Sequence, residues 1–164
     1  MSPASIAAAT ALIVFWLTAF VGEDYRRWRD AKALAAALAG EVESLKFGME
    51  LAEKTTRALL VVLESGGTFP TRTVPEQPLT VYNANLGRVG MLGTSIGRDL
   101  PFAYHMMYAY RVTMIGVFET DDATRRKSGL LVALPFIANA NDVLPSLLVK
   151  LQTRANQHWR PFRS

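Results

Sequence analysis

The chain has 164 residues, of which half are hydrophobic and 20% are charged, so it is long enough for about one domain and too apolar to be intrinsically disordered. Its 18 Lys and Arg residues against 14 Asp and Glu residues give a net charge of +4, an excess too small to indicate binding to nucleic acid. The absence of cysteine excludes disulfides, thiol nucleophiles and cysteine-ligated metal sites, two histidines are too few for a multi-histidine metal site, and we expect no cofactor.

The first 22 residues predict a transmembrane anchor. No charged side chain occurs in residues 1–22, and Ile6–Val21 is apolar apart from two threonines. About 20 helical residues span the roughly 30 Å hydrocarbon core of a bilayer, so residues 3–22 fit one crossing. A cleaved signal peptide is the alternative. An uncleaved signal-anchor is favoured because no Lys or Arg precedes the apolar run and residues 19–21 form a poor cleavage site.

A segment typical of the lipid–water interface follows the anchor. Aromatic and cationic side chains alternate there, and we expect a similar contact from the basic C-terminal tail, residues 156–164, unless that tail is simply solvated. The membrane-interface candidates are Tyr25, Arg26, Arg27, Trp28, Arg29, Trp159 and Arg160. Because positive charge flanks the anchor only on its C-terminal side, we expect a bacterial inner membrane location with the N-terminus outside and the C-terminal bulk cytoplasmic.

Residues 23–66 predict a juxtamembrane helical arm. A helix over 24–65, roughly 60 Å long, can continue from the anchor and end at Ser65-Gly66-Gly67. One face carries a heptad-like seam, with residues at alternating steps of four and three: Leu38, Val42, Leu45, Met49, Ala52, Thr56, Leu59 and Leu63. Packing of this seam on later helices of the same chain is favoured over a parallel coiled coil between neighbouring chains, because two further apolar helices can cover it.

A proline-rich connector, residues 67–80, leads to a helical bundle over residues 81–155. At its start, Asn83 is expected to cap a short helix over 84–89 that Gly90 ends in a left-handed conformation. Asn85 is expected to bind the backbone at this corner. The core-facing residues would be Tyr82, Leu86, Val89 and Leu92, and Thr94 or Ser95 would cap the next helix. The glycines of GRVGMLG are interpreted as turn residues, since no Gly-Lys-Ser/Thr follows.

Tyr82 and Asn85 form a Tyr-x-x-Asn motif after a proline, and Gly90 and Leu92 form the Gly-x-Leu that follows. This pattern resembles a widespread group of small bacterial membrane-anchored proteins of unknown function. In that group a helix with a Phe-Tyr or similar pair comes next, where this chain has Leu100 and Tyr104. The resemblance covers about a quarter of the chain and implies architecture, not an activity. Pro101 departs from the pattern and predicts a kink or a later helix start.

Residues 100–118 are apolar on almost every side. A second crossing is possible by length, but Arg111 near the middle would cost about 2.5–3.5 kcal/mol to insert, so a bundle or interfacial helix is favoured. Tyr104, Tyr108 and Arg111 are spaced to share one face, where they could form a tyrosine–arginine cluster. The candidate contact residues for a partner or ligand are Tyr82, Asn85, Tyr104, Tyr108 and Arg111. His105 is expected to be a hydrogen-bonded packing residue rather than a catalyst.

Residues 119–129 are interpreted as a polar, charged turn, in which Thr120, Asp121 or Asp122 can cap the last helical section. A second seam follows with the same alternating steps: Leu130, Leu134, Ile137, Asn141, Leu144, Leu148, Leu151 and Ala155. Pro135 and Pro145 interrupt this seam and predict kinked or broken helices rather than one rod.

These patterns predict an all-α fold: a transmembrane helix continuing into a long arm that packs with further helices as a small cytoplasmic bundle. The favoured function is that of a non-catalytic partner-binding or assembly subunit, since no catalytic constellation is found. Its expected partners are the lipid bilayer and either another membrane protein or a second copy, with no nucleic acid. Two alternatives are a membrane-perturbing effector or pore subunit that inserts 100–118 and 128–141, and a lipid- or small-ligand-binding membrane enzyme.

Overall fold

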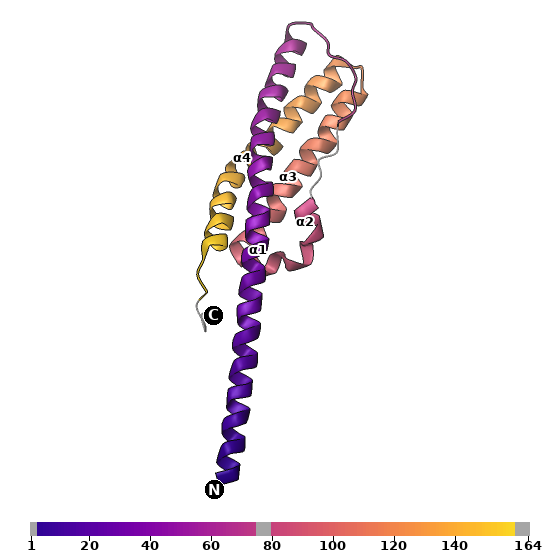
Figure 1. Ribbon diagram of the computed structural model, residues 1–164. Coiled ribbons are helices and arrows are strands. Elements are labelled where there is room, and N and C mark those ends of the chain that lie inside the picture. The colour runs from indigo at the N-terminus through magenta and orange to yellow at the C-terminus, as the bar shows by residue number, and fades with distance from the viewer. Residues whose placement is uncertain (1–2, 75–79, 160–164) are drawn as a thin grey trace.

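The computed structural model describes residues 3–74 and 80–159. In these ranges the chain is helical apart from its connections, and no strand occurs. The elements are α1 (Pro3–Glu64), α2 (Thr80–Ala84), the 3-10 helix η1 (Leu86–Leu92), α3 (Thr94–Glu119) and α4 (Ala123–Asn156). The C-terminal half of α1 lies beside α3 and α4, while its N-terminal half extends alone from the bundle (Figure 1). The predicted all-α bundle is confirmed.

Helix α1 runs without interruption from the apolar N-terminal stretch through the predicted arm. No proline lies between Pro3 and Pro70, and isolated glycines cost only about 1 kcal/mol each in a helix interior. The helix ends at the predicted position. Gly66 adopts φ +78°, and the backbone N–H of Gly67 donates to the carbonyl oxygen of Val62 at 2.9 Å, so two glycines supply the left-handed turn and the closing bond of a Schellman-type end.

The two predicted seams pack within one chain. Leu38, Val42, Leu45, Met49 and Thr56 are buried on α1, and Leu130, Ile137, Leu144 and Leu151 are buried on α4. The other seam residues are half-buried. Helices α1 and α4 run in opposite directions (Figure 1), as the ion pair between Glu64 and Lys127 at 3.1 Å and the hydrogen bond from Asn141 to Glu53 at 2.9 Å require. The favoured prediction of intramolecular packing is therefore confirmed.

Helix α4 corrects the expectation of broken helices. It continues through Pro135 and Pro145. Each proline removes one backbone hydrogen bond, but both rings lie on the exposed side, where solvent can satisfy the freed carbonyl groups. Buried residues on the opposite side hold the helix against α1 and α3. Its beginning is as predicted, because Asp122 Oδ1 accepts hydrogen bonds from the backbone N–H groups of Thr124 (2.8 Å) and Arg125 (3.2 Å).

The corner between the connector and α3 differs from its prediction in several details. The short α-helix α2 ends at Ala84, where the predicted helix would begin, so Asn83 lies inside α2 instead of capping a later helix, and the segment that follows is the 3-10 helix η1. Gly93, with φ +96°, takes the left-handed position that was expected at Gly90. Gly93 also precedes α3 as its N-cap, so neither Thr94 nor Ser95 caps that helix. The predicted backbone contact of Asn85 is confirmed, since its side-chain amide donates to Val81 O at 2.9 Å.

Two further details in this region differ from the prediction. Of the two outcomes predicted for Pro101, a kink or a later helix start, the later start is wrong, because α3 begins at Thr94 and contains Pro101. Leu86 is 55% exposed rather than facing the core, whereas Val89 and Leu92 are buried and Tyr82 is half-buried. Residues three apart lie on the same side of a 3-10 helix, so Leu86 shares its side with Val89 and Leu92. As the first residue of η1, however, Leu86 lies beyond the edge of the core that buries the other two.

Candidate interaction surfaces

The N-terminal part of α1, from Ile6 to Phe20, is covered by no other segment within residues 3–74 and 80–159. From Ile6 to Phe20 every side chain is exposed, including Trp16 at 71%. Within the described residues two helices are long and apolar enough to cross a membrane, namely the one over Ile6–Glu64 and the one over Ala123–Asn156. None of the apolar window in the first is buried, but 28% of that in the second is covered by the bundle. The bare stretch of α1 is thus the better candidate for insertion.

An aromatic cluster lies where α1 enters the bundle. The rings of Tyr25 and Trp28 lie 5.5 Å apart, and Trp159 from the C-terminal end of the chain meets Tyr25 edge-to-face at 5.3 Å. Lys32 places its Nζ 5.3 Å from the Trp28 ring. Three predicted interface residues from opposite ends of the sequence therefore come together. Arg160, the seventh candidate, lies outside the described residues.

The arginines of this region are partly neutralised along the helix. Arg26 and Arg27 pair with Glu23 at 3.7 and 2.9 Å, and Arg29 lies 3.3 Å from Asp30. All three arginines remain exposed, so each pair is worth less than about 1 kcal/mol. The indole N–H groups of Trp28 and Trp159 have no acceptor among the described residues. Such an arrangement of rings and cations is typical of side chains at headgroup depth.

A second face of α1, which sequence reasoning missed, points away from the bundle. Its members repeat at steps of four and three, and all are exposed: Ala33, Ala37, Gly40, Ser44, Phe47, Leu51, Lys54, Ala58 and Val61. From Gly40 on, each lies two residues after a member of the buried seam, which turns it about 200° around the helix. We call this set the back face. The same spacing that revealed the seam could have revealed it, because Lys54 is its one charged member.

The Tyr82–Asn85 corner is held together by interior contacts. The Tyr82 ring stacks on Tyr104 with centroids 3.9 Å apart and planes 13° from parallel. Glu41 Oε2 accepts the backbone N–H groups of Val81 (2.9 Å) and Tyr82 (3.1 Å). Burial raises the pKa of both tyrosines, and for Tyr104 the nearby Glu41 carboxylate raises it further. Both tyrosines are therefore neutral in the physiological range, and the contacts indicate a packed corner.

The expected cluster of Tyr104, Tyr108 and Arg111 does not form. Tyr104 is 3% exposed, whereas Tyr108 is 60% exposed, because Tyr82 covers the former and leaves the latter in solvent. Arg111 is half-buried, and in the described part of the chain no hydrogen bond or ring contact joins it to either tyrosine. His105 is exposed, so the expectation that it packs in the interior is wrong.

Arg126 is a buried residue that the sequence did not reveal. It donates to the carbonyl oxygens of Phe69 and Thr120, both at 2.6 Å, and to Thr71 Oγ1 and Asp121 Oδ1 at 3.3 and 3.2 Å. Its guanidinium also lies over the Phe69 ring at 4.6 Å. This side chain fixes the connector at the end of the bundle farthest from the bare helix (Figure 1). Its position four residues before Leu130 on the second seam was the available signal.

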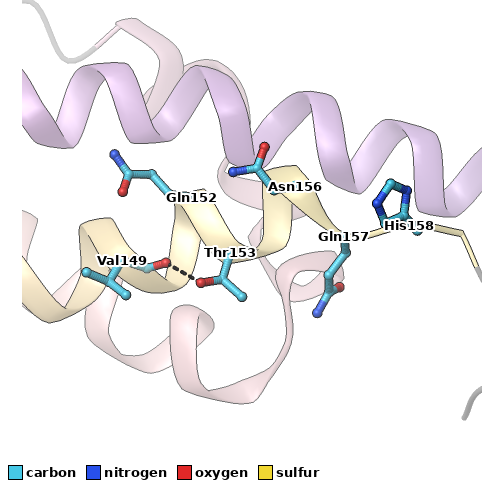
Figure 2. A pocket seen from close by; sticks show the side chains of 6 residues that line it. All are labelled: Val149, Gln152, Thr153, Asn156, Gln157 and His158. Carbon is cyan, nitrogen blue, oxygen red and sulfur yellow. Dashed lines mark hydrogen bonds between the residues drawn. The ribbon is translucent and has the colours of Figure 1, made fainter.

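A shallow hollow of about 530 Å³ lies on the outer side of α4 near its C-terminal end (Figure 2). It is lined by Val149, Gln152, Thr153, Asn156, Gln157 and His158. Thr153 Oγ1 donates to the carbonyl oxygen of Val149 at 2.7 Å, so this hydroxyl is already used within the helix. No group of His, Asp and Glu side chains in the described ranges could hold a metal ion.

Compared with known proteins, the chain matches no family model, no curated protein and no solved structure. The resemblance to small bacterial membrane-anchored proteins stays a prediction. Function must therefore be argued from the two surfaces, the aromatic cluster and the back face.

Proposed function

We propose that the protein is a single-pass membrane-anchored, non-catalytic subunit whose cytoplasmic helical bundle binds a partner or scaffolds an assembly. The observation that carries this proposal is the back face of α1. It continues from the bare apolar half of the same helix, and neither is covered by any other part of the described chain. The bare half would contact lipid, and the back face would contact a protein partner.

The composition of the back face supports a protein contact rather than a solvated surface. A helix face that meets water is normally rich in charged residues. Over about 42 Å of helix from Ala33 to Val61, this face carries only one charge, that of Lys54. Phe47 is 70% exposed, and Leu51 and Val61 are also exposed, although apolar residues of this size favour burial by roughly 1.5–3 kcal/mol each.

A second copy of the chain is the partner to which the geometry points first. Anchors in the same bilayer place two α1 helices parallel and at the same height, so identical residues face each other in a symmetric contact. Near the membrane the back face consists of Ala33, Ala37 and Gly40. Small residues of this kind let helix backbones approach closely, and farther along Phe47 and Leu51 supply apolar area.

Cysteine cross-linking tests this proposal in the intact protein, because the natural chain has no cysteine. Phe47→Cys should form a disulfide-linked dimer in membranes on mild oxidation. Val149→Cys, equally exposed but on α4, should stay monomeric. Adding Leu51→Glu should abolish the Phe47→Cys cross-link without releasing the protein from the membrane. A cross-link of Phe47→Cys to a different membrane protein would support the wider proposal of partner binding, whereas no cross-link to any protein would contradict it.

The alternative of a pore subunit is favoured by one observation, the apolar stretch of α4. Insertion of α4 would require its buried residues, such as Ile137 and Leu144, to leave the bundle. Dye leakage from vesicles that contain the protein tests this alternative. The proposed assembly role predicts no leakage above that of empty vesicles.

A further inference from the structure

We infer that η1 is a second membrane contact, through which the bundle rests on an anionic lipid surface. The inference rests on the anchor in the proposed function but does not depend on the back face. The contact surface consists of the aromatic cluster and the exposed residues of η1, and we call it the base: Tyr25, Trp28, Lys32, Leu86, Arg88 and Trp159. Figure 1 shows η1 crossing the bundle at the level where the bare half of α1 begins.

The height of the base follows from helix geometry. Helix α1 has no break between the apolar stretch, which ends at Val21, and the bundle. At 1.5 Å per residue, Tyr25 and Trp28 stand about 6 and 10 Å beyond Val21, and Asp30 about 14 Å. The headgroup region is roughly 5–8 Å deep on each side of a bilayer. The aromatic cluster is therefore at its outer edge, and η1 is only slightly farther out.

Contacts in the base fix η1 to the same height. Arg88 Nη2 lies 3.7 Å from Asp30 Oδ2, which places η1 beside the Asp30 turn of α1. On its other side, the carbonyl oxygen of Met91 accepts a hydrogen bond from Arg154 of α4 at 3.4 Å. Transmembrane helices are commonly tilted by about 20°, and a tilt of this size toward η1 lowers it by about 3 Å at a helix spacing of about 10 Å, so that its exposed side chains reach the headgroups.

The chemistry of η1 suits a lipid surface. Leu86 is exposed beside Gly87, Arg88 and Gly90, so an apolar side chain and a cation project from a segment with little side-chain bulk. In the described residues at this end, six cations meet three carboxylates: Arg26, Arg27, Arg29, Lys32, Arg88 and Arg154 against Glu23, Asp24 and Asp30. This end of the bundle is thus more basic than the rest of the described chain. Anionic lipids attract such a group by about 1 kcal/mol for each cation near the surface.

Lipid-borne quenching of single-cysteine labels tests this inference. The full chain carries a fluorophore at Leu86→Cys and is reconstituted in vesicles of phosphatidylcholine, with or without an equal part of phosphatidylglycerol. Headgroup spin-labelled lipid should quench this fluorophore about twofold more in the anionic vesicles. Ser128→Cys, exposed at the opposite end of the bundle, should be unquenched in both. Equal, low quenching at both positions would overturn the inference.

Arg88→Gln in the Leu86→Cys background should remove the extra quenching, as should high salt, because both weaken attraction to the anionic surface. The matched control is Arg125→Gln, an exposed arginine at the opposite end, which should change nothing. Unchanged quenching in the Arg88→Gln variant, with an unchanged circular dichroism melt, would also overturn the inference. A third label at Phe15→Cys separates the two proposals. If it is quenched by lipid while the Leu86→Cys label is not, the anchor stands and only the η1 contact fails.

Discussion

The two halves of α1 are continuous in backbone but opposite in surroundings. Residues 31–64 bury one face against α3 and α4, whereas residues 6–20 bury nothing. The packed half is amphipathic, with its seam turned inward, but the bare half is apolar around its whole circumference. This difference teaches that helix formation and helix packing have separate causes in this chain. Local propensity forms one long helix, and the distribution of apolar residues determines which part packs in the bundle and which part stays bare.

The back face is an exception to this contrast between the packed half and the bare half of α1. The packed half keeps a second, weaker apolar stripe that no other described segment covers. It is less apolar than the bare half, since Ser44 and Lys54 belong to it. This intermediate composition is typical of a surface that can meet water before it meets a protein partner.

The largest expected effect comes from charging the bare half. Leu12→Arg combined with Phe15→Arg should cost about 5–7 kcal/mol of insertion free energy, because each arginine near the centre of a crossing costs about 2.5–3.5 kcal/mol. The protein should move from the membrane fraction to the alkali-extractable fraction. Phe47→Arg, equally exposed on the same helix, is the matched control and should remain in the membrane. Full retention of the double variant would break the contrast between the two halves.

Shortening a buried side chain of the seam should have the opposite effect: it should destabilise the bundle and leave the membrane attachment intact. Leu38 is fully buried, and Leu38→Ala should lower the free energy of unfolding of the bundle by about 3–5 kcal/mol through lost burial and a residual cavity. Membrane retention should not change. Leu12→Ala, the same substitution in the bare half, should leave the denaturant midpoint of the bundle in detergent within error. A comparable loss from both variants would mean that the bare half also packs against protein.

Replacing Arg126, at the end of the bundle farthest from the bare helix, should cause a somewhat smaller loss of stability. Arg126→Ala leaves the carbonyl groups of Phe69 and Thr120 without their donor, and we expect a loss of about 3 kcal/mol in thermal unfolding experiments. Its neighbour Arg125 is exposed, so Arg125→Ala should stay within about 0.5 kcal/mol of the natural protein. Equal losses would show that charge near the α4 N-terminus matters, rather than burial.

The smallest effect concerns the pair that joins α3 to α4. Lys150 lies 2.6 Å from Asp99, and hydrogen bonds from Lys150 and Arg98 lower the pKa of the Asp99 carboxyl. A lowered pKa in the folded state stabilises the fold above the unfolded pKa, near 3.9, and this contribution disappears as the pH falls through the folded value. Asp99→Asn should therefore lose up to about 1 kcal/mol at pH 7.

Unfolding experiments over a series of pH values test this contribution of Asp99 to stability. The stability difference between Asp99→Asn and the natural protein should close in acid, below the folded pKa of Asp99. Asp142→Asn, at an exposed position on α4, should show no such difference at pH 7. If the stability difference between Asp99→Asn and the natural protein persists unchanged in strong acid, the effect comes from packing and not from the charge of Asp99.

Periodicity predicted the helices and the seams because apolar spacing records which face each helix buries. It failed at the corner over residues 80–93, where a 3-10 helix follows a short α-helix and the balance between them depends on contacts with Glu41 and Asp30, far away in the sequence. At Pro135 and Pro145 the sequence predicted kinked or broken helices, and the break does not occur because tertiary packing stabilises α4 around each missing bond. Arg126 escaped notice because its main acceptors are backbone carbonyls, which no side-chain pattern encodes.

The candidate surfaces were predictable to different degrees. Tyr25 and Trp28 follow the apolar stretch directly, so their position beside it could be predicted from the sequence, and their contact with a lipid interface stays a prediction. Their meeting with Trp159 could only be guessed, because it depends on the length and direction of α4. The back face has a clear periodicity but lay hidden behind the stronger seam.

The account's central claim is that α1 is one helix in two environments, lipid and bundle. Reaction of single cysteines with a water-soluble, membrane-impermeant maleimide tests it directly. In intact membranes Phe15→Cys should be protected and should react only after solubilisation, while Ser65→Cys, just beyond the end of the helix, should react freely from the cytoplasmic side. Equally fast reaction of Phe15→Cys and Ser65→Cys in intact membranes would contradict the claim.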